Sequence, residues 1–436
     1  VLLGIMAGCT SKSGDLQLDL TGTWQFQMDP EDQGVVEKWY DTELPETVQL
    51  PGSMVENGKG YAITLETEWT GGVRNPEWYN DPNYEPYHDP ENIRFPYWLQ
   101  PEKKYTGASW YQKKVTLPAG WTEKTVRLVL ERPHWETTVW VNGEWVGMQN
   151  SLATPHVFDV TSFLQAGENV LSVRVDNRIK DIDPGHNSHS ISDHTQSNWN
   201  GIAGDILLQG SGKIFFENVA LFPDVETKSV EIRAAVNNSL PGPQTVTFTG
   251  IASHKETGEL SKEETWEYDL VPGENIVKMH YVLGEDALLW DEFNPNVYQF
   301  SLSIESEDEG DSYVGDFGLR EFKVDGSRFS VNGRPVFLRG TLECAIFPLT
   351  GYPATDVAYW KKIYTAVKDH GLNHVRFHSW CPPEAAFVAA DEMGVYLQVE
   401  CSSWANQSTQ LGSGLPIDQY IWEESKRIVE AYGNHP

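Results

Sequence analysis

The sequence predicts a multidomain protein of the β plus α/β class, in which two β-sandwiches precede the first three βα units of a (β/α)8 TIM barrel. Between residues 16 and 326, short strands alternate apolar and polar residues and are separated by Gly and Pro, as is typical of sandwiches. From residue 335 onward, strands alternate with longer helical stretches, which indicates a parallel sheet. With 436 residues, the chain is also too long for one compact core.

The first sandwich is expected over residues 16–212, with a jelly-roll-like arrangement. In residues 126–131, Val126, Leu128 and Leu130 recur at every second position, which is the period of a half-buried strand. Further strands are expected at residues 110–117 and 169–176. Asn142-Gly143 lies between two strand-forming runs, and this dipeptide favours the type I′ turn of a β-hairpin.

The second sandwich is expected over residues 213–326. Its candidate strands are residues 219–222, 230–236, 245–249 and 298–304. The size of this block and the spacing of its strands fit an immunoglobulin-like sandwich. It contains no Cys, so the disulfide of antibody domains is absent.

The incomplete barrel is expected over residues 327–436. Its predicted strands are residues 336–339, 374–377 and 395–400, and its predicted helices are residues 355–370, 383–393 and 418–432. A barrel of this type needs eight such units over about 250 residues. Three parallel strands alone would leave a long unpaired edge, so we expect the natural protein to continue beyond Pro436.

The composition favours some partners and excludes others. Lys plus Arg number 32 and Asp plus Glu number 63, which gives a formal net charge of -31. A field of that sign repels phosphate backbones, so nucleic acid is not an expected partner. The chain has 17 Trp residues, and aromatic faces that are not needed in a core are good platforms for sugars.

The first 15 residues have the character of a processing signal. Residues 1–6 are apolar, Ala7 and Gly8 precede Cys9, and residues 10–15 are polar. This pattern resembles the end of a bacterial lipoprotein signal and predicts lipidation of Cys9. A lipoprotein signal of this kind predicts a location in the periplasm or on the surface of a Gram-negative bacterium, with a lipid anchor in the membrane. The alternative is an ordinary secretory signal with an incidental cysteine.

Several short motifs carry a family resemblance. They are Trp110-Tyr111-Gln112-Lys113-Lys114, Val141-Asn142-Gly143, Phe158-Asp159-Val160-Thr161, Phe317-Gly318-Leu319-Arg320, Asn373-His374-Val375-Arg376 and Asn434-His435-Pro436. Occurring in this order, across two sandwiches and into a barrel, they resemble glycoside hydrolase family 2. That family comprises β-galactosidases, β-glucuronidases and β-mannosidases.

The resemblance implies a retaining exo-β-glycosidase that acts on the terminal sugars of oligo- or polysaccharides. Such enzymes use two glutamates, a general acid/base and a nucleophile, with carboxyl groups about 5–5.5 Å apart. Both family positions fall beyond Pro436. This chain is therefore expected to contain no catalytic residue and to be inactive alone. No cofactor is required, although a magnesium ion is compatible with the family.

The resemblance also places substrate-binding residues at the carboxyl ends of the barrel strands, where active sites of this fold lie. The candidates there are Glu343, Arg376, His378, Trp380, Glu400, Trp404 and Asn406. Arg376 matches an arginine that supports the nucleophilic carboxylate. His378 is a candidate hydrogen-bond partner of a sugar, and Trp380 either stacks on the sugar or packs behind it. Glu400 either contacts substrate or magnesium, or pairs with an arginine.

Two loops of the first sandwich are also candidates for sugar contact. In the family, a loop before the stretch that corresponds to Gly201-Ile202 reaches the barrel, which selects Asp193, His194, Asn198 and Trp199. Residues 69–98 form a long segment rich in Trp and Tyr. A loop of that length either binds a ligand or packs as a unit.

Two further functional classes remain open. The first is a carbohydrate-binding or scaffold protein whose barrel has lost catalysis. The second is a metal-dependent hydrolase, because Cys344, Cys381 and Cys401 each follow one of three successive strands. Together with a glutamate they would suit zinc. Free cysteines, however, also pack well as small apolar groups.

Overall fold

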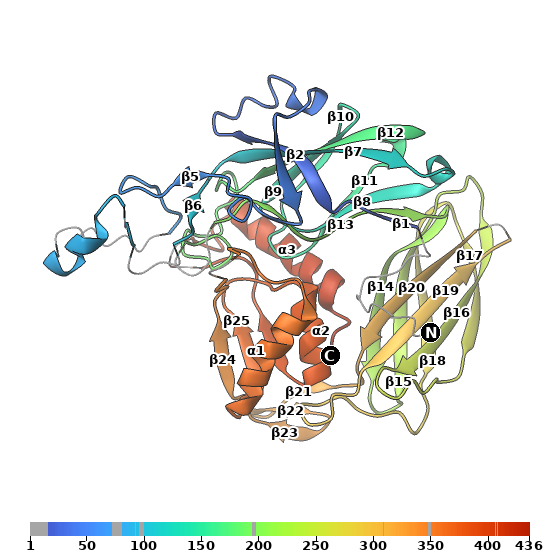
Figure 1. The fold of residues 1–436 in the computed structure, drawn as a ribbon. Helices are drawn as coiled ribbons and strands as arrows, with labels where there is room; N and C mark the ends of the chain where they lie inside the picture. The colour runs from blue at the N-terminus through green and yellow to red at the C-terminus, as the bar shows by residue number, and fades with distance from the viewer. Residues whose placement is uncertain are drawn as a thin grey trace, which may run out of the picture.

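The computed structural model describes residues 16–71, 81–91, 93–95, 100–193, 198–307, 309–347, 350–405, 407 and 409–436. In Figure 1, a first sandwich lies above an α/β part, and a second sandwich lies beside both. None of the helices in these described ranges has the length and apolarity that crossing a lipid bilayer requires.

The first sandwich packs a five-stranded sheet against a six-stranded sheet. The five-stranded sheet contains β1 (Gln17–Asp19), β13 (Gly201–Ser211), β8 (Thr125–Pro133), β11 (His156–Asp159) and β4 (Gly52–Ser53). The six-stranded sheet has the order β10 (Glu144–Gln149), β9 (Glu136–Val141), β12 (Gly167–Asp176), β7 (Ala108–Leu117), β2 (Gly22–Asp29) and β3 (Glu46–Leu50). A short pair, β5 (Tyr61–Ala62) and β6 (Lys103–Lys104), lies at one end. Alternating residues of both sheets form one buried core, so the predicted sandwich is confirmed.

The predicted hairpin is present between β9 and β10. Asn142 and Gly143 have φ values of 52° and 82°, the left-handed conformations that a type I′ turn requires. A Cβ on Gly143 would lie 2.1 Å from the Asp41 carboxylate, so a larger residue there would also displace that side chain. The two residues therefore fix the register in which Glu144 pairs with Val141.

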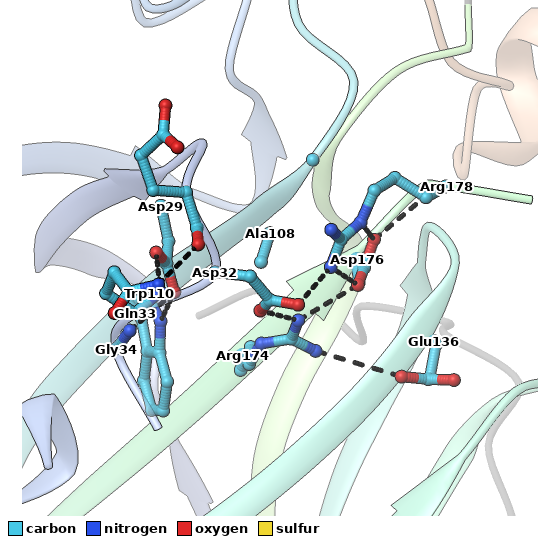
Figure 2. A network of polar contacts seen from close by, with 12 residues as sticks. Asp29, Asp32, Gln33, Gly34, Ala108, Trp110, Glu136, Arg174, Asp176 and Arg178 are labelled. Atoms are coloured by element: carbon cyan, nitrogen blue, oxygen red, sulfur yellow. Dashed lines mark hydrogen bonds and ion pairs between the residues drawn. The ribbon is translucent and has the colours of Figure 1, made fainter. Parts of the chain in front are cut away.

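An ion-pair network lies on the outer face of the six-stranded sheet (Figure 2). Val173 and Val175 of β12 point into the core, so Arg174 and Asp176 point outward. Asp176 accepts hydrogen bonds from Arg174 at 3.0 Å and Arg178 at 2.6 Å. Asp32, in the segment after β2, accepts from the same two arginines at 2.6 and 2.8 Å. The network therefore holds that segment on β12.

The second sandwich is also confirmed. A three-stranded sheet contains β14 (Ile214–Asp224), β15 (Ser229–Asn238) and β18 (Gly273–Val282). It faces a four-stranded sheet of β17 (Glu264–Leu270), β16 (Gln244–His254), β19 (Tyr298–Glu305) and β20 (Gly310–Phe317). The pairings are antiparallel, and the inward residues form a core separate from that of the first sandwich. Two antiparallel sheets of this size fit the immunoglobulin-like prediction.

A small antiparallel sheet connects the second sandwich to the α/β part. It contains β21 (Phe322–Asp325), β22 (Arg328–Val331) and β23 (Arg334–Val336). Asn332 and Gly333 have φ values of 50° and 74° and reverse the chain, so β23 returns along β22. The predicted strand at residues 336–339 is therefore wrong, because the first parallel strand begins only at Gly340.

The α/β part has the order strand, helix, strand, helix, strand, helix. The elements are β24 (Gly340–Glu343), α1 (Val357–Asp369), β25 (His374–Phe377), α2 (Glu384–Met393), β26 (Tyr396–Val399) and α3 (Pro416–Tyr432). The three strands are parallel neighbours in the order β24-β25-β26. The Asp356 carboxylate caps α1 by accepting from the Tyr359 N–H at 2.8 Å, and Gly394 ends α2 with a φ of 66°.

Helix α3 joins the α/β part to the first sandwich. The buried Glu424 carboxylate accepts a hydrogen bond from the Leu152 N–H at 2.8 Å and from the Ser151 hydroxyl at 3.1 Å. The Tyr432 hydroxyl donates to the Ala153 carbonyl at 3.1 Å. These contacts hold residues 151–153 of the first sandwich against α3.

Candidate functional site

The side of the parallel sheet that each strand residue faces is set by the register. Leu342 pairs with Arg376, and Arg376 pairs with Gln398. The neighbouring positions Phe377 and Val399 pack among the helices. Because side chains alternate along a strand, Arg376 and Glu400 face the side opposite the helices. We call the carboxyl ends of the three strands on that side the mouth.

Arg376 and Glu400 form the central contact of the mouth. The Arg376 Nε donates to Glu400 Oε1 at 2.5 Å, and the backbone N–H of Ser379 donates to Glu400 Oε2 at 2.7 Å. Each carboxylate oxygen therefore has its own donor. The Arg376 side chain is 41% exposed, and its guanidinium has further donors at the two terminal nitrogens. Of the two alternatives for Glu400, pairing with an arginine is present in the structure.

Glu343 does not lie in the mouth with Arg376, contrary to expectation. It pairs with Phe377, whose side chain packs among the helices, so Glu343 also faces that side. Its carboxylate accepts from the N–H groups of Ala345 at 2.8 Å and Ile346 at 3.3 Å and so shapes the loop after β24. Burial raises the pKa of Glu343 to about 7, despite these hydrogen bonds.

Three aromatic rings from different segments meet beside Arg376. The centroid of the His378 ring lies 4.5 Å from the ring centroid of Trp404 and 4.9 Å from that of His189, which belongs to the first sandwich. Nδ1 of His378 is buried without a hydrogen-bond partner among the described residues. Burial lowers the pKa of His378, so the ring is held in its neutral form. The structure thus brings the candidate residues His378 and Trp404 together and adds His189.

Trp380 occupies a packing position. Its side chain is 2% exposed, and its ring centroid lies 5.3 Å from that of Phe377 and 5.9 Å from that of Phe347. Its indole N–H donates to the Glu343 carbonyl at 3.3 Å. A ring enclosed in this way has no open face for a sugar, so packing is the alternative that the structure favours.

Asp193, Asn198 and Trp199 form a buried network inside the first sandwich and its loops. Asp193 accepts from the Lys104 ammonium at 2.7 and 2.8 Å and from the N–H of Asn198 at 2.9 Å. Trp199 stacks on His134 at 4.9 Å, and Asn198 Oδ1 lies 3.1 Å from His134 Nε2. The side chains of Asp193, Asn198 and Trp199 are 0%, 2% and 3% exposed, so they are almost fully enclosed by the protein and support the loop.

Other predicted positions lie outside the described residues. They are His194 and Asn406 at the site, Cys9 at the predicted lipidation signal, and Trp78, Tyr79, Tyr97 and Trp98 in the aromatic segment. The described part of that segment packs on itself, since Trp69 and Phe95 lie 4.9 Å apart edge to face within a small apolar cluster.

The three cysteines within the described residues lie in different environments. Cys381 is fully buried with Phe387 and Tyr432, whereas Cys401 Sγ lies 3.1 Å from the Ser425 hydroxyl. Burial raises the pKa of Cys344 to about 11, which disfavours the thiolate that zinc requires. Within the described ranges, no group of three or more His, Cys, Asp or Glu side chains is arranged to hold a metal ion.

Sequence reasoning missed Ser379 and His189. Ser379 has a φ of 53°, which is uncommon for a residue other than glycine. Nothing in the sequence marks that conformation. His189 lies a few residues before the candidates of the first sandwich, between His186 and His194, but the family position favoured residues closer to Gly201.

Comparison with known proteins identifies the family. Residues 18–211 match the model described as "Glycosyl hydrolases family 2, sugar binding domain", and residues 214–320 match "Glycosyl hydrolases family 2". A β-galactosidase of Leuconostoc mesenteroides is 24% identical over 96% of this chain and 38% of its own length. A β-galactosidase of Thermoanaerobacter pseudethanolicus is 27% identical over 82% of this chain and 47% of its length. The chain thus spans less than half of these two relatives.

Solved structures show the same fold. A Bacteroides uniformis β-glucuronidase superposes with a TM-score of 0.72 at 20% identity, covering 97% of this chain and 46% of its own. A β-glucuronidase from Ruminococcus gnavus gives a TM-score of 0.68 at 18% identity, covering 97% and 65%. Two family models in sequence order, similar relatives and a shared fold agree, and the chain belongs to glycoside hydrolase family 2.

Proposed function

We propose that this chain is the N-terminal part of a retaining exo-β-glycosidase that removes terminal sugars from oligo- or polysaccharides. The observation that carries the proposal is the Arg376–Glu400 pair at the ends of adjacent parallel strands, where TIM-barrel enzymes have their active sites. The family relatives named β-galactosidase and β-glucuronidase support a β-linked substrate.

In this proposal, residues 327–436 are the first three units of a (β/α)8 barrel, after modules at residues 16–212 and 213–326. The chain covers less than half of the matched β-galactosidases, which supports further barrel units in the whole protein. Phe337 and Leu342, before and within the outer strand β24, are 76% and 51% exposed. Apolar residues at an unpaired strand are where a neighbouring strand would pack.

Both catalytic glutamates lie C-terminal to this chain in the proposed enzyme. One protonates the leaving oxygen, and the other attacks the anomeric carbon to give a glycosyl-enzyme, which water then hydrolyses with retention. Arg376 holds the attacking carboxylate ionised through its terminal nitrogens, since a guanidinium lowers the pKa of a nearby carboxyl group. Glu400 fixes the guanidinium through Nε. His378 and Trp404 form a wall beside the sugar.

The test is hydrolysis of a panel of aryl β-glycosides by the full-length protein. Arg376→Ala is expected to lower kcat/KM by about 100-fold or more, as removal of one preorganised electrostatic group typically does. Arg328→Ala, an exposed arginine on β22, is the matched control and should retain wild-type rates. The first sugar anomer released, followed by NMR, should be β. An inverted product or a wild-type-like Arg376→Ala enzyme would contradict the proposal, and sugar binding without hydrolysis would favour a carbohydrate-binding protein.

The remaining parts of the proposal concern cofactors and location. No cofactor is needed for the proposed chemistry, and rates that are unchanged by EDTA would agree, whereas recovery by Mg²⁺ would establish a magnesium requirement. We further propose that Cys9 is lipidated and anchors the protein in the periplasm or at the surface of a Gram-negative cell. Radiolabelled palmitate should then be incorporated into the wild type and not into Cys9→Ser.

A further inference from the structure

Ser379 connects the first sandwich to the mouth through each of its polar groups. Its N–H donates to Glu400 Oε2 at 2.7 Å, and its hydroxyl accepts from the His189 N–H at 2.9 Å. Its carbonyl accepts from the hydroxyls of Ser188 at 3.1 Å and Ser190 at 2.9 Å. A serine with a φ of 53° persists only where its surroundings determine the conformation, and these contacts do so.

The sandwich segment that makes these contacts is residues 183–192, which we call the docking loop. It also contacts the chain after β26, because the Trp404 N–H donates to the Pro184 carbonyl at 3.0 Å and the Thr409 hydroxyl donates to the Asp183 carbonyl at 2.9 Å. The docking loop therefore binds the segments that follow two adjacent parallel strands. Ser188 and Ser190 are buried, so these contacts are shielded from water.

The contacts continue from Ser379 to the functional arginine. Glu400 uses one oxygen for the Ser379 N–H and the other for the Arg376 Nε. The carboxylate plane is fixed only while both donors are in place. Without the contacts to its hydroxyl and carbonyl, Ser379 would be free to move, and its N–H would no longer fix the second oxygen of Glu400.

We propose that the docking loop is a positioning element for Arg376, acting through Ser379 and Glu400. Ser188 and Ser190 are positioning residues that touch neither substrate nor the reacting carboxylates. The inference rests on the proposed function, because it assigns Arg376 the task of keeping the nucleophile ionised. It implies that the first sandwich contributes to the ionisation state of the mouth as well as to folding.

The experiment compares Ser188→Ala/Ser190→Ala with the wild type in the full-length protein. The acid limb of the kcat/KM profile reports ionisation of the nucleophile in the free enzyme. The double variant should lower kcat/KM about 10-fold and move that limb upward by about 0.5 to 1 pH unit, because a displaced guanidinium lowers the carboxyl pKa less. KM should change little. A second measurement follows amide hydrogen exchange of the peptide that contains Ser379, which should be faster in the double variant.

Ser172→Ala is the matched control, since this buried hydroxyl donates to the Tyr40 carbonyl at 3.3 Å within the same sandwich and away from the mouth. Its acid limb should coincide with that of the wild type. A fall in kcat/KM with an unmoved limb, an equal shift in Ser172→Ala, or unchanged exchange at Ser379 would each overturn the inference. If the wild type hydrolyses no aryl glycoside, the proposed function fails, and hydrogen exchange alone then decides whether the docking loop holds Ser379.

Discussion

Replacing Asp193 with alanine would leave the ammonium of Lys104 buried without its counter-charge. The Asp193 side chain is fully buried and that of Lys104 nearly so, and the two are joined by hydrogen bonds of 2.7 and 2.8 Å. The same carboxylate accepts from the N–H groups of Thr70 at 2.5 Å and Asn198 at 2.9 Å. The substitution therefore leaves one charge and two backbone donors without their acceptor.

The size of the effect follows from burial. Removing one partner of a buried ion pair typically lowers the free energy of unfolding by about 3–5 kcal/mol, because the remaining charge is uncompensated. For a module of the size of the first sandwich, each kcal/mol shifts Tm by about 2–4 °C, so the expected decrease is on the order of 10 °C. Lys104→Met together with Asp193→Ala removes the stranded charge but leaves the two backbone donors unpaired, so it should recover part of that loss.

The assay is thermal and urea unfolding followed by tryptophan fluorescence. Glu217→Ala is the control, because Glu217 pairs with Arg127 at 3.0 Å but is 40% exposed, and exposed pairs contribute about 1 kcal/mol or less. The reasoning would be refuted if Asp193→Ala lowered stability no more than this control. It would also be refuted if the double variant were no more stable than Asp193→Ala.

Three further outcomes are expected from the ionisable groups. Burial alone would raise the pKa of Asp176, but hydrogen bonds from Arg178 and the neighbouring cations hold it well below its usual range. The ionised form of Asp176 therefore stabilises the fold at pH values above the unfolded-state pKa of about 3.9, and this contribution is lost as the pH falls below that value. Asp176→Asn should be less stable than the wild type at pH 7. It should also lose less stability in acid titrations followed by circular dichroism. The pH dependence contributed by Glu343 has the opposite sign. Burial raises the pKa of Glu343 to about 7, so the free energy of unfolding falls as pH rises from about 4.3 toward 7. Glu343→Gln should reduce this pH dependence, as measured by urea titrations at several pH values. Burial also raises the pKa of Cys381, so thiol labelling at pH 8, read by peptide mass spectrometry, should spare Cys381 in the native protein and modify it in urea; labelling at equal rates in both states would contradict its buried position.

Much of the architecture was accessible from local patterns. The strand at residues 374–377 was predicted with its observed bounds, and the Asn142-Gly143 hairpin was predicted with its turn type. Both depend on neighbours in sequence, namely side-chain alternation and the left-handed preference of Asn-Gly. The first parallel strand was misplaced because Arg334–Val336 pairs with β22, a choice made by the reversal at Asn332 and not by strand propensity.

The sequence predicted which residues lie at the ends of the strands, but it did not predict which of them are exposed or which residues they contact. Arg376 and Glu400 were both expected at strand ends, and the structure joins them. Which residues around them are open depended on contacts between distant segments. Trp380 and Trp199 are of the residue type that stacks on sugars, yet rings from other parts of the chain pack against both side chains.

The sequence by itself determined the order of the modules, the family and the identity of the arginine at the second parallel strand. Periodicity, turns and motifs depend only on residues that are close together in the sequence. Only the tertiary structure decided that Glu343 faces the helices, that Asp193 binds Lys104, and that Ser188 and Ser190 hold Ser379. The physical reason is that side-chain orientation and burial depend on strand register and on contacts across nearly two hundred residues of chain, as in the Ser188–Ser379 hydrogen bond with its sequence separation of 191.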